Sequence, residues 1–188
     1  MRVSQAEKDK SHARIVTGAA RLLRERGIEG ASVADVMTHA GLTHGGFYRH
    51  FNDKEALLAA ALESAFDEVL RDRAPAPDAA DSGEGVDAFR DFYLSEGHRN
   101  NPGIGCPVAA LGAEVARGSA ALKTAFGAGV NRMVAALERG MKGAAAAKRA
   151  KALRELAMLA GAVMIARASD PDTAEDMLAA CRGGRPGL

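Results

Sequence analysis

The 188-residue sequence lacks several features that whole classes of protein require. It has only two cysteines, Cys106 and Cys181. Neither is accompanied by a second cysteine or a histidine pair at metal-ligand spacing, so we expect neither a zinc site nor a structural disulfide. No apolar run approaches the roughly 18 residues that a membrane span needs. Residues 1–8 are polar, so we expect no secretory signal, no membrane association and a cytoplasmic location.

A surplus of charge is also missing, since 25 Lys and Arg balance 24 Asp and Glu to a net charge of +1. The whole chain is therefore not expected to bind nucleic acid through bulk charge. Residues 1–54 nevertheless hold nine Lys and Arg against six Asp and Glu, together with four of the five histidines. The basic bias is mild, and 47% hydrophobic with 26% charged residues is typical of a globular protein.

No segment alternates β-branched and polar residues, so the sequence predicts an all-α protein. Apolar residues at helical spacing predict a first helix over residues 10–26, which Gly27 stops. Ser32, with Asp35 three residues on, is expected to cap a second helix, and Thr43 a short third one.

The rest of the chain also has helical spacing. A long fourth helix is predicted to begin at Asn52 and to precede a Pro-containing stretch at 74–83, which we interpret as a loop. The later helices are predicted over residues 85–97, 107–116, 119–142 and 145–168 and from Pro171, followed by a loose tail over 182–186.

The segment between the second and third helices, Ala40-Gly41-Leu42, has the length and the glycine of a helix-turn-helix turn. Glycines at 45 and 46 weaken the third helix by roughly 1 kcal/mol each relative to alanine, a cost that makes sense where the backbone approaches a partner closely. Phe47 is expected to face inward. The hydroxyl, guanidinium and imidazole groups of residues 48–50 then point outward, where they suit phosphates and base edges.

Over about residues 13–58 the sequence resembles the TetR/AcrR family of repressors. The resemblance rests on Ser32-Val33-Ala34-Asp35-Val36, Ala40-Gly41-Leu42, Gly46-Phe47-Tyr48-Arg49-His50-Phe51 and Lys54-Glu55-Ala56-Leu57-Leu58. It implies an all-helical homodimer, with an N-terminal three-helix helix-turn-helix DNA-binding domain at residues 1–54 and a C-terminal helical dimerisation and ligand-binding domain at residues 55–188. The candidate DNA-binding residues are Ser32, Thr43, His44, Gly45, Tyr48, Arg49, His50 and Lys54.

A metal site at His44 and His50 is an alternative use of these imidazoles. No cysteine or carboxylate joins the two histidines at useful spacing, so we expect no metal and no cofactor. Lys54 has its own alternative, because it could be a solvated residue near a helix start. A cation is slightly disfavoured there, and this favours a contact with phosphate.

The C-terminal half holds a few aromatic residues that could line a pocket or simply form the core. Its Gly105-Cys106-Pro107 is similar to a subgroup of the family in which some members sense electrophiles or oxidants. Cys106 is either a small packed residue or a thiolate activated by a helix N-terminus. The candidate ligand-binding residues are Phe89, Phe92, Tyr93, Cys106 and Phe126.

Small residues recur on the helix predicted over 145–168 and would let two helices approach closely, although an internal core is the alternative. The resemblance implies that the last two helices form the dimer interface. The candidate interface residues are Ala157, Gly161, Met164 and Met177.

These features predict a sequence-specific transcriptional regulator. We expect a repressor that binds a palindromic double-stranded DNA operator as a homodimer and is released by a small-molecule or electrophile inducer. One alternative is a structural DNA-binding protein without a ligand. However, the chain has about 130 residues beyond the helix-turn-helix domain, which exceeds what DNA binding needs. The other is a cysteine-dependent enzyme, for which no recognisable residue spacing is present, so we expect no enzymatic activity.

Overall fold

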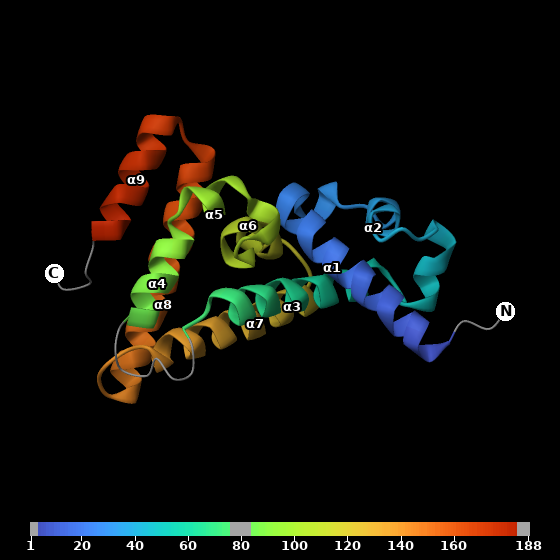
Figure 1. Ribbon diagram of the computed structural model, residues 1–188, viewed down its shortest axis with the longest axis horizontal. Helices are drawn as coiled ribbons and strands as arrows, with labels where there is room; N and C mark the ends of the chain where they lie inside the picture. Colours follow the sequence, from blue (N-terminus) through green and yellow to red (C-terminus); the bar gives the residue numbers. More distant parts are fainter. Residues whose placement is uncertain (1–3, 76–83, 184–188) are drawn as a thin grey trace.

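The computed structural model describes residues 4–75 and 84–183, and all regular structure within these two ranges is helical. The helix-turn-helix unit, defined here as residues 4–54, lies at one end of an elongated molecule, and the helical body, residues 55–75 and 84–183, forms the remainder (Figure 1). The elements in chain order are α1 (Gln5–Gly30), α2 (Val33–His39), the 3-10 helix η1 (His44–Arg49), α3 (Lys54–Arg73), α4 (Glu84–Tyr93), α5 (Glu96–Asn100), the 3-10 helix η2 (Pro102–Ile104), α6 (Pro107–Val115), α7 (Ala120–Arg139), α8 (Ala145–Ala168) and α9 (Pro171–Gly183).

Local sequence signals shape the helix-turn-helix unit. Ser32 and Asp35 form the predicted capping box of α2: the Asp35 N–H donates to Ser32 Oγ at 3.1 Å, and the Ser32 N–H donates to Asp35 Oδ2 at 3.3 Å. Gly41 follows α2 with φ of +68°, a left-handed conformation that glycine reaches without steric cost. η1 comes directly after this turn, and its Phe47 is buried in the core.

The helix α3 joins the two parts of the molecule because it packs against α1 and against α7. Gly129 lets α7 lie close to α3, since a Cβ there would fall 2.1 Å from the ring of Phe66. One continuous apolar core therefore runs from Ile15 of α1 to Leu178 of α9. The predicted domain boundary between residues 54 and 55 falls in the first turn of α3 and stays a prediction.

The first helix is longer than predicted. It starts at Gln5 because the Ser4 hydroxyl caps it. Gly27 interrupts the helix without ending it, since its φ of +79° is non-helical and one further turn follows. The Glu114 carboxylate of α6 accepts the Ile28 N–H at 2.7 Å, so the interruption leaves this donor paired.

Three other elements also differ from the prediction. The helix that follows Thr43 is a 3-10 helix, η1, and not an α-helix. The N-cap of α3 is Asp53, whose carboxylate accepts a first-turn N–H at 2.7 Å, and not Asn52. The single helix predicted over 85–97 is two helices, α4 and α5, because the Ser95 hydroxyl caps a new start.

The remaining elements lie close to their predicted ranges. The helix predicted over 119–142 stops at Arg139, with Gly140 as its C-cap. The helix predicted over 145–168 has those bounds. Residues 76–83 of the predicted loop and 184–186 of the predicted tail lie outside the described residues.

Candidate nucleic-acid interface and ligand site

One face of η1 points to solvent and carries four of the eight predicted DNA contacts. Tyr48 has 73% of its surface exposed, whereas the adjacent Phe47 is 2% exposed and stacks on Phe51 with 5.8 Å between ring centroids. The buried rings anchor the helix, so the exposed face is available to a partner. A Cβ on Gly45 would meet no atom within 4 Å, which leaves the backbone open there. The other exposed residues of this face are His44 and Arg49.

The remaining predicted contacts surround this face. Ser32 is exposed at the start of α2, where its hydroxyl donates to Asp35 Oδ2 at 2.6 Å, and this hydrogen bond is the main cause that lowers the pKa of Asp35. Thr43 is exposed at the start of η1, and its hydroxyl makes no capping hydrogen bond to the described part of that helix. Lys54 is partly exposed at the start of α3.

His50 is set back from the exposed face. It is partly buried, and its ring centroid lies 5.9 Å from that of His12. Burial lowers the pKa of His50, and the neighbouring charges of His12, Lys8 and Arg49 lower it further. Its Nδ1 has no hydrogen-bond partner among the described residues. A neutral His50 can form a hydrogen bond to a ligand but adds no positive charge at neutral pH.

The five residues predicted to bind a ligand do not line a common cavity within the described ranges. Phe89, Tyr93 and Cys106 are 2%, 0% and 0% exposed and belong to the core. Phe126 is partly buried and packs edge-on against an aromatic ring of α3. Phe92 is partly buried against the core and also lines a groove. These positions favour the alternative that the residues belong to the core.

The surroundings of Cys106 make its thiol a poor nucleophile. Cys106 occupies the N-cap of α6, where the helix terminus was expected to lower the thiol pKa, but burial raises the pKa of Cys106. Its Sγ lies 3.7 Å from Sδ of Met133. Burial and the raised pKa therefore favour the packed alternative for Cys106 over an activated thiolate. The neighbouring Tyr93 hydroxyl is fully buried and interacts with the Cys106 thiol, which lowers the thiol pKa less than burial raises it.

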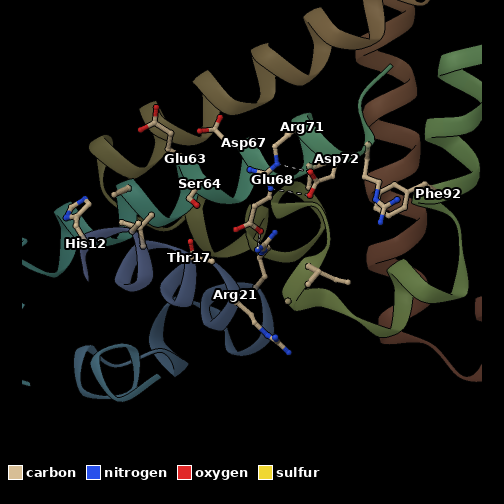
Figure 2. A pocket seen from close by; sticks show the side chains of 18 residues that line it. His12, Thr17, Arg21, Glu63, Ser64, Asp67, Glu68, Arg71, Asp72 and Phe92 are labelled. Carbon is tan, nitrogen blue, oxygen red and sulfur yellow. Dashed lines mark hydrogen bonds and ion pairs between the residues drawn. The ribbon is translucent and has the colours of Figure 1, made fainter. Parts of the chain in front are cut away.

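A groove of about 850 Å³ lies between α1 and α3, with Phe92 of α4 at one end (Figure 2). Its walls are mixed: α1 contributes Val16, Thr17 and Arg21, and α3 contributes Val69 and Ser64 together with several paired charges. The Arg73 guanidinium lies 4.7 Å from the centroid of the Phe92 ring. Sequence analysis did not find this groove because its two walls are about 50 residues apart in the chain.

The predicted dimer residues share a partly apolar stripe on α8. Leu153 and Met164 are 44% and 49% exposed, and Ala157 between them is exposed. A Cβ on Gly161 would meet no atom within 4 Å, so this side of the helix is uncovered in the single chain. Met177 of α9 is partly buried against the core.

Three long-range hydrogen bonds connect the helix-turn-helix unit to the body, and sequence analysis missed all three. Arg24 of α1 is buried and bonds Glu68 and Gly105, which follow it by 44 and 81 residues. Glu114 of α6 accepts the Ile28 N–H described above. The only sequence signal for Arg24 is its position at the edge of an apolar helix face, four residues after the buried Ala20.

The described part of the chain contains no group of three or more His, Cys, Asp or Glu side chains placed to hold a metal ion. No helix in that part is both long and apolar enough to cross a membrane.

Comparisons with known proteins bear on these features. Residues 15–61 match the family described as bacterial regulatory proteins, tetR family. An uncharacterised HTH-type transcriptional regulator of Mycobacterium tuberculosis is 33% identical over 102 residues, which cover 54% of this chain and 51% of that protein. The HTH-type transcriptional regulator TtgR of Pseudomonas putida is 36% identical over 64 residues, covering 34% and 30%. The chain thus spans about half the length, or less, of these curated relatives.

Solved structures resemble nearly the whole chain. The reduced form of Escherichia coli NemR superimposes with a TM-score of 0.73 at 21% identity, covering 95% of this chain and 99% of that one. A TetR transcriptional regulator from Chloroflexus aurantiacus gives a TM-score of 0.72 at 24% identity, covering 95% of each chain. At these identities the likeness shows the fold.

A glycine turn, an exposed short helix behind it and an all-helical body define the fold of a helix-turn-helix regulator. The family match falls on that unit, so residues 15–61 are similar to the DNA-binding part of the tetR family, and the structural likeness extends the same fold over the body. The predicted all-α fold class and the resemblance stated from the sequence are confirmed.

Proposed function

We propose that this protein is a sequence-specific DNA-binding transcriptional regulator that acts as a repressor. The observation that carries the proposal is the exposure of Tyr48, 73% accessible on a helix whose other side is anchored by the buried Phe47. An exposed aromatic ring on a fixed backbone, next to Arg49, suits insertion into a DNA groove. Cytoplasmic localisation follows from the proposal, because the protein must reach chromosomal DNA.

In the proposed complex, η1 supplies the base contacts and its surroundings supply the phosphate contacts. Tyr48, Arg49 and His44 meet base edges or adjacent phosphates. Gly45 lets the backbone approach closely because it is exposed and its surroundings are open. The contacts at the edge of this footprint are Ser32, Thr43, His50 and Lys54.

We propose further that two chains bind a palindromic operator. A single helix-turn-helix unit reads too few base pairs for useful specificity, so two units read half-sites about one helical turn apart or slightly more. The exposed stripe of α8, with Ala157, Gly161 and Met164, and Met177 of α9 form the interface between the chains. The stripe supports this role because Met164 is 49% exposed in the single chain.

A small-molecule inducer is proposed to bind in the body around Tyr93. The fully buried Tyr93 hydroxyl interacts with the Cys106 thiol, which is a weak hydrogen-bonding group, so a stronger polar partner would stabilise this hydroxyl. A ligand that bonds this hydroxyl would have to displace the packed rings of Phe89, Phe92 and Phe126 beside Cys106, because these side chains lie in the core or against it in the single chain. Such a ligand releases DNA only if it favours a conformation in which the two units are wrongly spaced.

The experiment that tests the DNA-binding proposal is selection of duplexes from a randomised double-stranded library by the purified full-length chain. Palindromic duplexes should be enriched. In footprinting, the bound protein should protect two half-sites on each of these duplexes. A chain that enriches no sequence over competitor DNA at physiological salt would refute the proposal. An enzyme remains disfavoured because burial raises the pKa of Cys106, the only candidate nucleophile that the sequence offered.

A further inference from the structure

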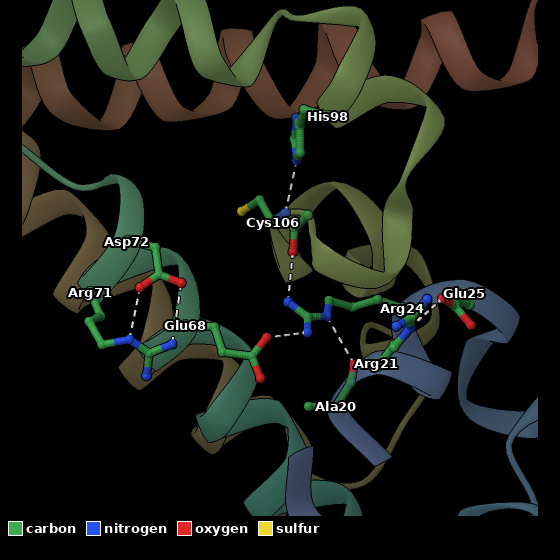
Figure 3. Close-up of polar contacts among 10 residues, drawn as sticks. Ala20, Arg21, Arg24, Glu25, Glu68, Arg71, Asp72, His98 and Cys106 are labelled. Carbon is green, nitrogen blue, oxygen red and sulfur yellow. Dashed lines mark hydrogen bonds and ion pairs between the residues drawn. The ribbon is translucent and has the colours of Figure 1, made fainter. Parts of the chain in front are cut away.

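Arg24 is a buried arginine at the junction of three structural elements (Figure 3). Its Nε donates to the Ala20 carbonyl of its own helix α1 at 2.9 Å. Its Nη1 donates to the Gly105 carbonyl between η2 and α6 at 3.0 Å, and its Nη2 donates to Glu68 Oε2 of α3 at 2.5 Å. The side chain is 1% exposed, so these bonds form away from solvent.

The geometry of the guanidinium turns these bonds into a positional constraint. The bond to the Ala20 carbonyl fixes the planar group against α1, and the two remaining nitrogens then point in fixed directions. One nitrogen donates to Glu68 of α3, and the other donates to the Gly105 carbonyl between η2 and α6. Two attachments in different directions restrict rotation of α1 on the body, which apolar packing alone restricts less because it has no direction.

The constraint continues through the body by direct hydrogen bonds. Next to Gly105, the Cys106 N–H donates to His98 Nε2 at 2.9 Å. The His98 carbonyl in turn accepts from Nη2 of Arg167 in α8 at 2.8 Å. A chain of polar contacts therefore leads from Arg24 in the helix-turn-helix unit to the helix that carries the proposed dimer interface.

We propose that Arg24 is a positioning residue that sets the angle of the helix-turn-helix unit relative to the dimer interface, and thereby the half-site spacing that the dimer accepts. The inference rests on the proposed function. Arg24 does not touch DNA in this arrangement, since it is buried against the body and not on the face of η1.

The test measures spacing preference and not affinity alone. A palindrome selected by the wild-type chain is remade with its two half-sites kept and their separation changed by one and two base pairs. The wild-type dimer should lose about tenfold or more in affinity with each change, because its units are held at one spacing. Arg24→Met keeps the apolar stem but removes all three hydrogen bonds, so the same changes should cost less than about threefold while the preferred half-site sequence stays the same.

A matched control separates positioning from loss of stability. Arg90 is 12% exposed and bonds Glu155, 2% exposed, at 2.7 Å, and this pair joins α4 to α8 within the body. Arg90→Met should lower the melting temperature as Arg24→Met does but leave the spacing preference as in the wild type. Glu68→Gln keeps the hydrogen bond from Arg24 to Gly105 and should broaden the preference for half-site spacing by an intermediate amount. This variant replaces Arg24→Met in the test if Arg24→Met does not fold.

The outcomes are distinct. If Arg24→Met or Glu68→Gln weakens binding equally at every spacing, as Arg90→Met does, the residue is only structural and the inference is wrong. If the wild-type chain selects no duplex at all, the proposed function fails and the inference fails with it. A flattened spacing profile in the variants, with the half-site sequence unchanged, supports the inference.

Discussion

The helix-turn-helix unit and the helical body use their polar side chains in opposite ways. In the unit, the polar groups around η1 face solvent, and their structural partners lie within a few residues along the chain, as in the capping box of Ser32 and Asp35. In the body, His98 and Glu155 are 2% and 3% exposed, and their partners include residues 65 to 69 positions away. The face around η1 exposes its polar groups to a partner, whereas the body, together with the buried Arg24 of α1, uses such groups for internal contacts.

The largest expected effect tests whether the body works through a second copy of itself. Gly161→Arg places a long charged side chain on the exposed stripe of α8, where a Cβ meets no atom within 4 Å, so the single chain should fold normally. The variant should sediment as a monomer and lose at least about 100-fold in operator affinity, because one helix-turn-helix unit cannot use both half-sites.

Gly127→Arg on α7 is the control, since a Cβ there also meets no atom within 4 Å. It should remain dimeric and bind as the wild type does. A Gly161→Arg chain that still sediments as a dimer would place the interface elsewhere.

The second effect tests whether the exposed side chains of η1 contact DNA. Tyr48→Ala should weaken operator binding by about 10- to 100-fold, because a base contact contributes roughly 1–3 kcal/mol. The melting temperature should hardly change, since Tyr48 is 73% exposed. Ile104→Ala, at a residue 62% exposed outside the unit, should change neither quantity. Wild-type affinity in Tyr48→Ala would remove η1 from the interface.

The third effect tests whether a buried polar group of the body, His98, stabilises the fold. Burial lowers the pKa of His98 from 6.5 to about 4, and its neutral ring accepts the Cys106 N–H. The unfolded chain binds more protons between these two pKa values, so stability falls as pH drops below 6.5. From pH 8 to pH 5 the loss is about 2 kcal/mol, on the order given by proton linkage. Denaturant unfolding at several pH values measures it.

His98→Gln is the control for that measurement. The amide does not titrate, so the dependence of stability on pH over the same interval should become shallower, even though the variant is less stable at pH 8. If the wild-type and His98→Gln slopes are equal, another group carries the pH dependence.

The smallest expected effect tests whether Lys54, at the edge of the helix-turn-helix unit, contacts a DNA phosphate. Lys54→Ala should weaken binding similarly for all DNA sequences and reduce the slope of log affinity against log salt by about one unit, as one lost phosphate contact predicts. Lys123→Ala, at an exposed lysine of α7, should leave the slope unchanged. Titrations at four salt concentrations suffice, and an unchanged slope in Lys54→Ala would make Lys54 a solvated residue.

The contrast between the two parts also explains what the sequence could predict. The α2 cap, the glycine turn and the inward-facing Phe47 depend on neighbours in the chain, and all three were predicted correctly. The N-cap of α3 was wrong by one residue because Asn52 and Asp53 are both good caps and only geometry chooses between them.

In the body, and where the unit meets it, the sequence predicted helices but not their polar contacts. Helical spacing places Arg24 at the edge of an apolar face, yet nothing local identifies Glu68 or Gly105 as its partners. The residues proposed for a ligand were chosen as aromatics in an aromatic-poor segment. All five lie within the core or against it, because large side chains are also what fills a core.

The interruption of α1 at Gly27 limits how this protein can be recombined. The Ile28 N–H that the interruption frees is accepted by Glu114 of the body, and a Cβ on Gly27 would lie 2.7 Å from that carboxylate. Residues 1–54 grafted onto the body of another regulator would lose this acceptor unless that body placed a carboxylate at the same point. The DNA-binding half is therefore not a portable module, and a chimaera of this protein would need to carry α6 along with its first three helices.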